Sequence, residues 1–169
     1  MRGEGEEPLL ILGDTGMGKT TMLFQLAEEL PEMRFVYVSG ENIADMPMLF
    51  QRLAAQPLKF MVAVDDAELN HISSISVKLI PINVLLVATH TLQNNGTSIA
   101  GGVFSKRIML TIPRLDDYAD ITQRLLVAMG CDLPKERVRS ACVDHQVDTK
   151  CTMTIASAVA VADSLRGIL

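Results

Sequence analysis

The sequence has little of several features that would assign a chain to a specialised class. Among its 169 residues there is no tryptophan, and there are only 2 tyrosines and 5 phenylalanines. Leu, Ile, Val, Ala and Met must therefore fill the interior, as is common where helices cover a parallel sheet. No apolar run approaches the roughly 20 residues that cross a bilayer, and the acidic start lacks the apolar segment of a signal peptide. We therefore expect a soluble, cytoplasmic protein.

Positive charge and cysteine are also scarce. The formal net charge is −5, which argues against a large basic surface for nucleic acid on this segment alone, but leaves room for a local patch or for DNA held by an oligomer. The cysteines are Cys131, Cys142 and Cys151, and they form no CxxC pair. Together with His145 they match no familiar zinc spacing. We therefore expect ordinary thiols rather than a metal site.

One stretch near the beginning carries a strong chemical signal. An apolar run, 9–12, leads into the glycine-rich turn GDTGMGKT and then into an amphipathic helix. Strand, turn and helix in this order are the context that a phosphate-binding loop requires. Its glycines let the backbone approach a polyphosphate, and the backbone N–H groups and the positive end of the helix then face the anion. The residues that we predict to bind a nucleoside triphosphate are Gly13, Asp14, Thr15, Gly16, Met17, Gly18, Lys19, Thr20 and Thr21.

Two residues of this stretch have predicted individual roles. Lys19 adds a point charge that can reach the β- and γ-phosphates, and the hydroxyl of Thr20 is placed to ligate Mg²⁺. The alternative is a glycine turn that matches the phosphate-loop pattern by chance. The agreement of strand, spacing and helix favours the phosphate loop.

A second signal is a pair of carboxylates at the end of a buried strand. The apolar run 60–64 leads directly into Asp65 and Asp66. In an open α/β sheet, ligands bind outside the carboxyl ends of the strands. We therefore expect Asp65 to bind Mg²⁺ alongside the phosphate-loop threonine, and Asp66 to polarise an attacking water as general base. Glu68 is a competing base, and the structural alternative for the acidic pair is a helix N-cap.

Short strands alternate with helices up to about residue 113, and only helices follow. This pattern predicts an α/β fold with a parallel sheet of about five strands over residues 1–114, followed by a small helical subdomain over residues 115–169. Asp45 is the expected N-cap of the second helix, and 69–79 is helical or mixed. The expected strands are 9–12, 35–38, 60–64, 82–88 and 107–112, and the expected C-terminal helices are 118–129, 134–143 and 149–165.

In this order the motifs resemble those of the AAA+ ATPase family. The likeness covers nearly the whole chain and runs through 13–20, 63–66, 86–90 and 103–107 into the helical tail. It implies a three-layer P-loop NTPase core with a C-terminal helical lid. It also implies ATP and Mg²⁺ as cofactors and ATP hydrolysis as the activity.

The resemblance also implies roles for single residues. In that family a polar sensor residue lies on the strand that the sheet places between the strand of the phosphate loop and the strand of the acidic pair. It corresponds here to Thr89 or His90, and His is unusual at this place. The arginine finger corresponds to Arg107, with Lys106 as a second candidate. The lid residue called sensor 2 corresponds to Lys150, where the family has an arginine that can fork two phosphate oxygens.

A finger and a lid imply a homo-oligomer, a ring or a filament, in which Arg107 acts on the ATP of a neighbouring subunit. We expect an ATPase module that remodels a protein or nucleic-acid partner and that is part of a longer protein. Asp66 replaces the Glu that the family usually prefers, so hydrolysis could be slow, and a nucleotide-gated switch or assembly scaffold is the first alternative. A small-molecule P-loop kinase is the second, although the arginines after Arg107 lie in the helical tail.

Overall fold

A computed structural model describes residues 7–68, 70–71, 75–92, 104–111, 113–149 and 154–167. Contacts divide the chain into two compact units: unit 1 contains residues 1–14 and 19–110, and unit 2 contains residues 15–18 and 111–169. The expected division into domains after residue 114 stays a prediction. In the part of the chain that the structure describes, no helix is long and apolar enough to cross a membrane.

Unit 1 is built on a parallel sheet, which confirms the predicted α/β class. Its strand order is β2-β3-β4-β1-β5, and each neighbouring pair is parallel. The interior strand β3 is buried along its whole length, as expected for a parallel strand that is covered on both faces. The strands are β1 (Leu9–Gly13), β2 (Arg34–Ser39), β3 (Phe60–Asp65), β4 (Val84–Thr91) and β5 (Lys106–Met109).

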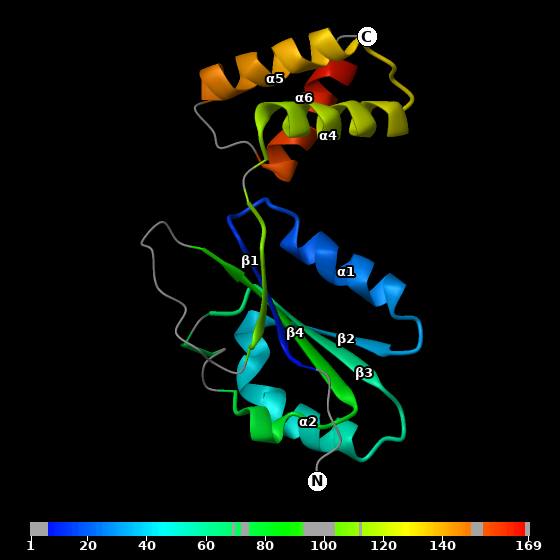
Figure 1. Ribbon diagram of the computed structural model, residues 1–169, viewed down its shortest axis with the longest axis vertical. Helices are drawn as coiled ribbons and strands as arrows, with labels where there is room; N and C mark the ends of the chain where they lie inside the picture. Colours follow the sequence, from blue (N-terminus) through cyan, green and yellow to red (C-terminus); the bar gives the residue numbers. More distant parts are fainter. Residues whose placement is uncertain are drawn as a thin grey trace. The chain divides into compact units, whose positions relative to one another are not determined.

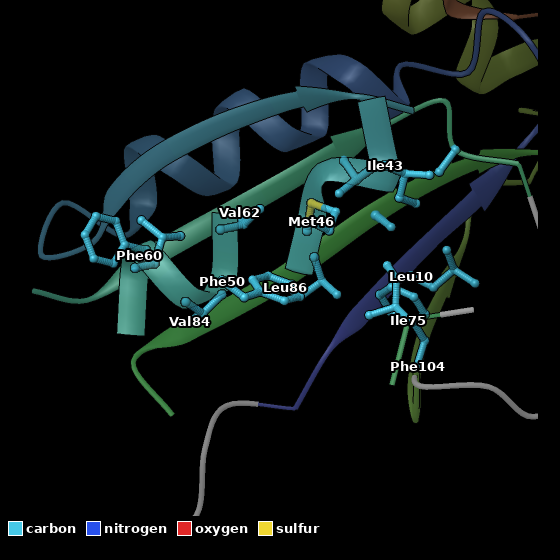
Figure 2. Packing of buried hydrophobic residues seen from close by; sticks show 14 of the residues in the cluster. Leu10, Ile43, Met46, Phe50, Phe60, Val62, Ile75, Val84, Leu86 and Phe104 are labelled. Atoms are coloured by element: carbon cyan, nitrogen blue, oxygen red, sulfur yellow. The ribbon is translucent and has the colours of Figure 1, made fainter. Parts of the chain in front are cut away.

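Helices cover both faces of this sheet, so unit 1 has three layers (Figure 1). On one face, Phe50 and Met46 of α2 (Met46–Ala54) pack with Val62 and Leu86 of the sheet, as Figure 2 shows. On the other face, α1 (Lys19–Glu29) buries Leu23 against the sheet. A short 3-10 turn, η2 (Val77–Leu79), precedes β4.

The second helix begins directly after Asp45, as predicted, but without the expected side-chain cap. A 3-10 helix, η1 (Gly40–Asp45), runs straight into α2, so the backbone at Asp45 is already helical, with φ −84° and ψ −4°. An N-cap side chain needs an extended backbone to reach the N–H groups of the first turn. Asp45 is therefore the N-cap residue of α2, as predicted, but its side chain makes no capping hydrogen bond.

In unit 2, α4 (Leu115–Ala128), α5 (Lys135–Thr149) and α6 (Ile155–Arg166) enclose a second apolar cluster. All three helices were predicted, but α5 continues six residues beyond the expected end at Val143, and α6 begins at Ile155 rather than at Thr149. No Gly or Pro interrupts 143–154, and three threonines there could each cap a helix. The structure selects Thr154, whose extended backbone and side chain cap α6 together with Ser157.

Candidate active site

The phosphate-loop sequence joins the end of β1 to the first turn of α1. The Lys19 side chain is buried and bends back on this loop. Its Nζ donates hydrogen bonds to the carbonyl oxygens of Gly13 and Asp14, each at 2.9 Å. Burial lowers the pKa of Lys19, while the carboxylates of Asp66, Asp65 and Asp14 act in the opposite direction. The ammonium group thus lies at the mouth of the loop, where phosphate oxygens can replace the two carbonyls.

Two glycines of the loop cannot be replaced without strain. Gly16 and Gly18 have φ of 79° and 81°, a region that L residues rarely adopt. Within unit 2, a Cβ on Gly16 would lie 3.0 Å from Thr154 Oγ1, and a Cβ on Gly18 would lie 2.9 Å from Ile155 Cδ1. The N–H of Ala156 also donates to the Gly16 carbonyl at 3.2 Å. The backbone conformation therefore favours glycine at both positions, and a Cβ would also force the side chains of Thr154 and Ile155 to shift.

Asp65 is the centre of a cluster of hydroxyl groups in unit 1. Its Oδ2 accepts hydrogen bonds from Thr20 Oγ1 at 2.7 Å and from Tyr37 Oη at 3.0 Å. Its Oδ1 accepts one from Thr89 Oγ1 at 2.6 Å. These donors come from α1, β2 and β4, so three elements converge on the carboxyl end of β3. Asp65 is 8% exposed, and each of its carboxylate oxygens accepts at least one hydrogen bond.

Asp66 adopts a backbone conformation that is rare for any residue except glycine. Its φ is +53°, which costs about 1–3 kcal/mol for a non-glycine residue and occurs mainly where surrounding structure enforces it. Here its N–H donates to Thr89 Oγ1 at 2.7 Å, and its Oδ1 accepts from Thr91 Oγ1 at 3.0 Å. The exposed carboxylate is thereby fixed at the rim of the sheet rather than at the start of a helix.

The structure separates the roles of the two sensor candidates. Thr89 is fully buried and points to Asp65, whereas the neighbouring His90 side chain points to the other face, with Nδ1 2.7 Å from the carbonyl oxygen of Ala67. Side chains alternate along a strand, so only one of the two can face the carboxylates. Thr89 holds that position, and Thr91 shares its face.

The donors gathered here suit a magnesium ion. A hydroxyl oxygen from Thr20 and a carboxylate oxygen from Asp65 are hard ligands of the kind that Mg²⁺ prefers. Among the described residues, no group of three or more His, Cys, Asp or Glu could hold a metal by itself. The protein oxygens would therefore be completed by phosphate and water, which is usual for Mg²⁺.

Comparison with known proteins assigns the chain to a family. Over residues 1–90 the sequence matches the family described as "Protein of unknown function (DUF815)". This chain belongs to the DUF815 family. No curated protein matches the sequence.

Solved structures share the fold. RuvB from Thermotoga maritima, described as a Holliday junction branch migration motor, matches with a TM-score of 0.60 and 17% identity, over 97% of this chain and 63% of that one. PCH-2 from C. elegans matches with a TM-score of 0.59 and 14% identity, over 92% of this chain and 59% of that one. These likenesses show that the chain shares the fold of these proteins. The chain spans less than two thirds of the length of either.

The region that matches the DUF815 family contains the phosphate loop, the acidic pair and the sensor strand, but Arg107 and Lys150 lie beyond it. Arg107 is exposed on β5, in register with Leu10. At about 3.3 Å per residue, this is roughly 10 Å along the strand from Gly13, so a finger role would act on a neighbouring chain. Lys106 pairs with Glu7 at 3.3 Å. Lys150 lies outside the described residues, and α6 opens at Thr154 instead.

The sequence did not point to three residues that lie at this candidate site: Tyr37, Thr91 and Gly40. A Cβ on Gly40 would lie 2.4 Å from the carbonyl oxygen of Asp66, so the acidic turn needs glycine beside it. Tyr37 could have been found once β2 was placed next to β3, because residues two apart on a strand share a face. Nothing in the sequence alone specifies that neighbour.

Proposed function

We propose that this chain is the nucleotide-binding part of an AAA+-type ATPase, which binds ATP with Mg²⁺ and couples hydrolysis to conformational change in an oligomer. The hydrogen bond between Thr20 and Asp65 carries the proposal, since it joins residues 45 positions apart at 2.7 Å. A phosphate-loop threonine and a strand-end aspartate are the two protein groups that hold the metal in P-loop NTPases. The AAA+ fold and the buried Lys19 beside both groups support the same reading.

Each residue has a defined task in this proposal. The loop N–H groups and Lys19 bind the phosphates, while Thr20 and Asp65 hold Mg²⁺, which neutralises charge on the phosphates when bound. Asp66 accepts a proton from water, which attacks the terminal phosphorus as the bond to the leaving oxygen breaks. Thr89 fixes the backbone of Asp66 relative to the Asp65 carboxylate, because its Oγ1 accepts from the Asp66 N–H and donates to Asp65.

Nucleotide binding by the Lys19→Ala variant tests the proposal. We expect affinity for a fluorescent ATP analogue with Mg²⁺ to fall about 10- to 100-fold, because a hydrogen bond to a charged group contributes roughly 1.5–3 kcal/mol. Lys59→Ala is the matched control, since Lys59 is an exposed lysine of the same unit, and it should bind as the wild type does. Equal binding by wild type and Lys19→Ala would refute the proposal.

A nucleotide-gated switch with little hydrolysis is the second candidate. The specific observation that favours it is Asp66 itself, whose short carboxylate is engaged by Thr91 in an unusual backbone conformation. Turnover of wild type and of Asp66→Asn separates the two functions. An ATPase loses most of its turnover in Asp66→Asn while retaining ATP binding, whereas a switch has the same low turnover in both. Phosphate release to water without a phosphoacceptor would also argue against a kinase.

The remaining parts of the proposal concern other chains. We propose a homo-oligomer, a ring or a filament, in which Arg107 completes a neighbour's site. RuvB is described as a branch migration motor, and a remodelling task on a protein or nucleic-acid partner is proposed for this chain by analogy of fold alone. The net charge of −5 favours a protein partner for this segment.

A further inference from the structure

Tyr37 reaches the proposed metal ligand from the edge of the sheet. Its Oη donates to Asp65 Oδ2 at 3.0 Å, and the same oxygen accepts from Thr20 Oγ1 at 2.7 Å. Tyr37 lies on β2, which is the edge strand, and its side chain is 48% exposed. A phenylalanine would cover this surface equally well, so burial of the ring does not explain the hydroxyl group. The hydroxyl is explained by the carboxylate that it meets.

The Tyr37 ring is itself held by α1. It stacks on the Phe24 ring, with centroids 5.8 Å apart and an angle of 13° between the planes. Phe24 follows Thr20 by four residues on α1, so the two side chains lie on one face of the helix. The contacts therefore close a circuit from Thr20 to Asp65, to Tyr37, to Phe24 and back along α1. A shift of α1 against β2 must disturb both hydrogen bonds to Oδ2.

We propose that Tyr37 is a positioning residue that orients the Asp65 carboxylate for Mg²⁺, and that its stack on Phe24 keeps it in place. The inference rests on the proposed function. Without the hydroxyl, only Thr20 on Oδ2 and Thr89 on Oδ1 would orient the carboxylate, and Oδ2 would lose one of its two donors. Metal binding would then have to supply more of this ordering, which lowers affinity for Mg²⁺ but not for the nucleotide itself.

The test is Mg²⁺ titration of nucleotide binding by the Tyr37→Phe variant. This change removes the hydroxyl and keeps the aromatic stack. With a fluorescent ADP analogue present, we expect the Mg²⁺ concentration at half-effect to rise about three- to tenfold, which is below the usual range for a hydrogen bond to a charged group because the pair is partly exposed to water. In EDTA, affinity for the analogue should stay within about twofold of wild type. A purely structural role for Tyr37 would lower both affinities together.

The Phe24→Leu variant tests the second half of the proposal. Loss of the stack should raise the Mg²⁺ requirement less than Tyr37→Phe does. In a Tyr37→Phe background, Phe24→Leu should have no further effect, because it acts through the missing hydroxyl. Additive effects of the two changes would overturn the link through the stack.

The outcomes separate this inference from the function on which it rests. If wild type binds no nucleotide, the proposed function fails and Tyr37 has no metal site to serve. If wild type binds nucleotide and Lys19→Ala does not, but Tyr37→Phe needs no more Mg²⁺ than wild type, only the role of Tyr37 is overturned. Circular dichroism melts of each variant show whether a loss comes from unfolding instead. If Tyr37→Phe is unfolded, Phe24→Leu alone, which keeps the hydroxyl but removes the stack that holds it, should still raise the Mg²⁺ requirement.

Discussion

At the residue scale, the backbone of Asp66 packs directly against Gly40. A Cβ on Gly40 would lie 2.4 Å from the carbonyl oxygen of Asp66 and 2.7 Å from Cα of Ala67. Both atoms belong to the backbone of the acidic turn, which cannot move without disturbing the Asp65 cluster. We therefore expect Gly40→Ala to lower the free energy of unfolding by about 1–3 kcal/mol, the usual cost of overpacking, as measured by urea unfolding.

Gly167→Ala is the control for this prediction. The atoms nearest to a Cβ there lie 3.6 and 3.7 Å away, which is ordinary contact, and its φ is −70°. It should be neutral or slightly stabilising, because alanine restricts the unfolded chain. If the two variants lose equal stability, the close approach at Gly40 is not the cause.

Cys142 makes a second prediction at this scale. The side chain is fully buried, and burial raises the pKa of its thiol, although the hydrogen bond to Thr122 acts in the opposite direction. The thiolate is the reactive form, so iodoacetamide at mildly alkaline pH should label the partly exposed Cys131 well before Cys142. Peptide mass spectrometry measures the two rates, and urea should make them equal. Early labelling of Cys142 in the folded protein would contradict this.

The raised pKa of the Cys142 thiol also makes the stability of the protein depend on pH. Because the folded protein holds the Cys142 proton more tightly than the unfolded chain does, stability is fully present below the ordinary thiol pKa of about 9. It should fall as the pH rises above that value, until the raised folded-state pKa is passed. The melting temperature should therefore fall more between neutral and alkaline pH for wild type than for Cys142→Ala.

At the scale of elements, the end of α2 depends on a side chain from a different segment. Asn83 Nδ2 donates to the carbonyl oxygens of Leu53 at 3.1 Å, Gln56 at 3.2 Å and Leu58 at 2.8 Å. The last carbonyls of a helix have no partner within it, so Asn83 caps α2 and joins it to the segment before β4. A carboxylate cannot donate these bonds and repels the carbonyl oxygens.

Asn83→Asp should therefore destabilise the protein more than Asn83→Ala does. We expect about 1 kcal/mol for the alanine variant and up to about 3 kcal/mol for the aspartate at neutral pH, since unmade bonds to charged groups cost more. Urea unfolding followed by circular dichroism gives both values. Protonating the new carboxyl at acidic pH should narrow the difference between them, and an unchanged difference would show that the carboxylate charge is not responsible.

The elements also show what the sequence could predict. Strand positions follow from short apolar runs bounded by turn residues, and all five lie close to where they were expected. Helix ends were less accurate, because local signals compete: three threonines offered starts for α6, and the 3-10 turn before α2 leaves the predicted N-cap Asp45 without a side-chain capping hydrogen bond. Phosphate-loop and carboxylate positions were predictable because they sit at strand ends. Tyr37 was not, because its role depends on which strands are neighbours.

At the scale of the whole molecule, the position of Arg107 determines how the proposed oligomer can be tested. In its own chain, this residue is in register with Leu10, at the end of the sheet edge away from the phosphate loop. A finger that acts only on a neighbour makes two defective variants complementary. Lys19→Ala lacks a working loop but keeps the finger, and Arg107→Ala has the opposite defect. Mixed at equal amounts, the two should recover about a quarter of wild-type turnover, since a quarter of randomly formed interfaces pair an intact loop with an intact finger.

The neighbouring Lys106 provides the matched control for this experiment. It is an exposed cation on the same strand that pairs with Glu7, so Lys106→Ala alone should keep most of its turnover, while Arg107→Ala alone should lose at least about 1,000-fold, as trans-acting arginines do in P-loop enzymes. If Arg107→Ala retains turnover, or if co-assembled variants recover none, Arg107 is not a finger acting across subunits. If Lys106→Ala fails and complements in place of Arg107→Ala, the role passes to Lys106, because a strand that alternates its side chains presents only one of the two cations to a neighbouring chain.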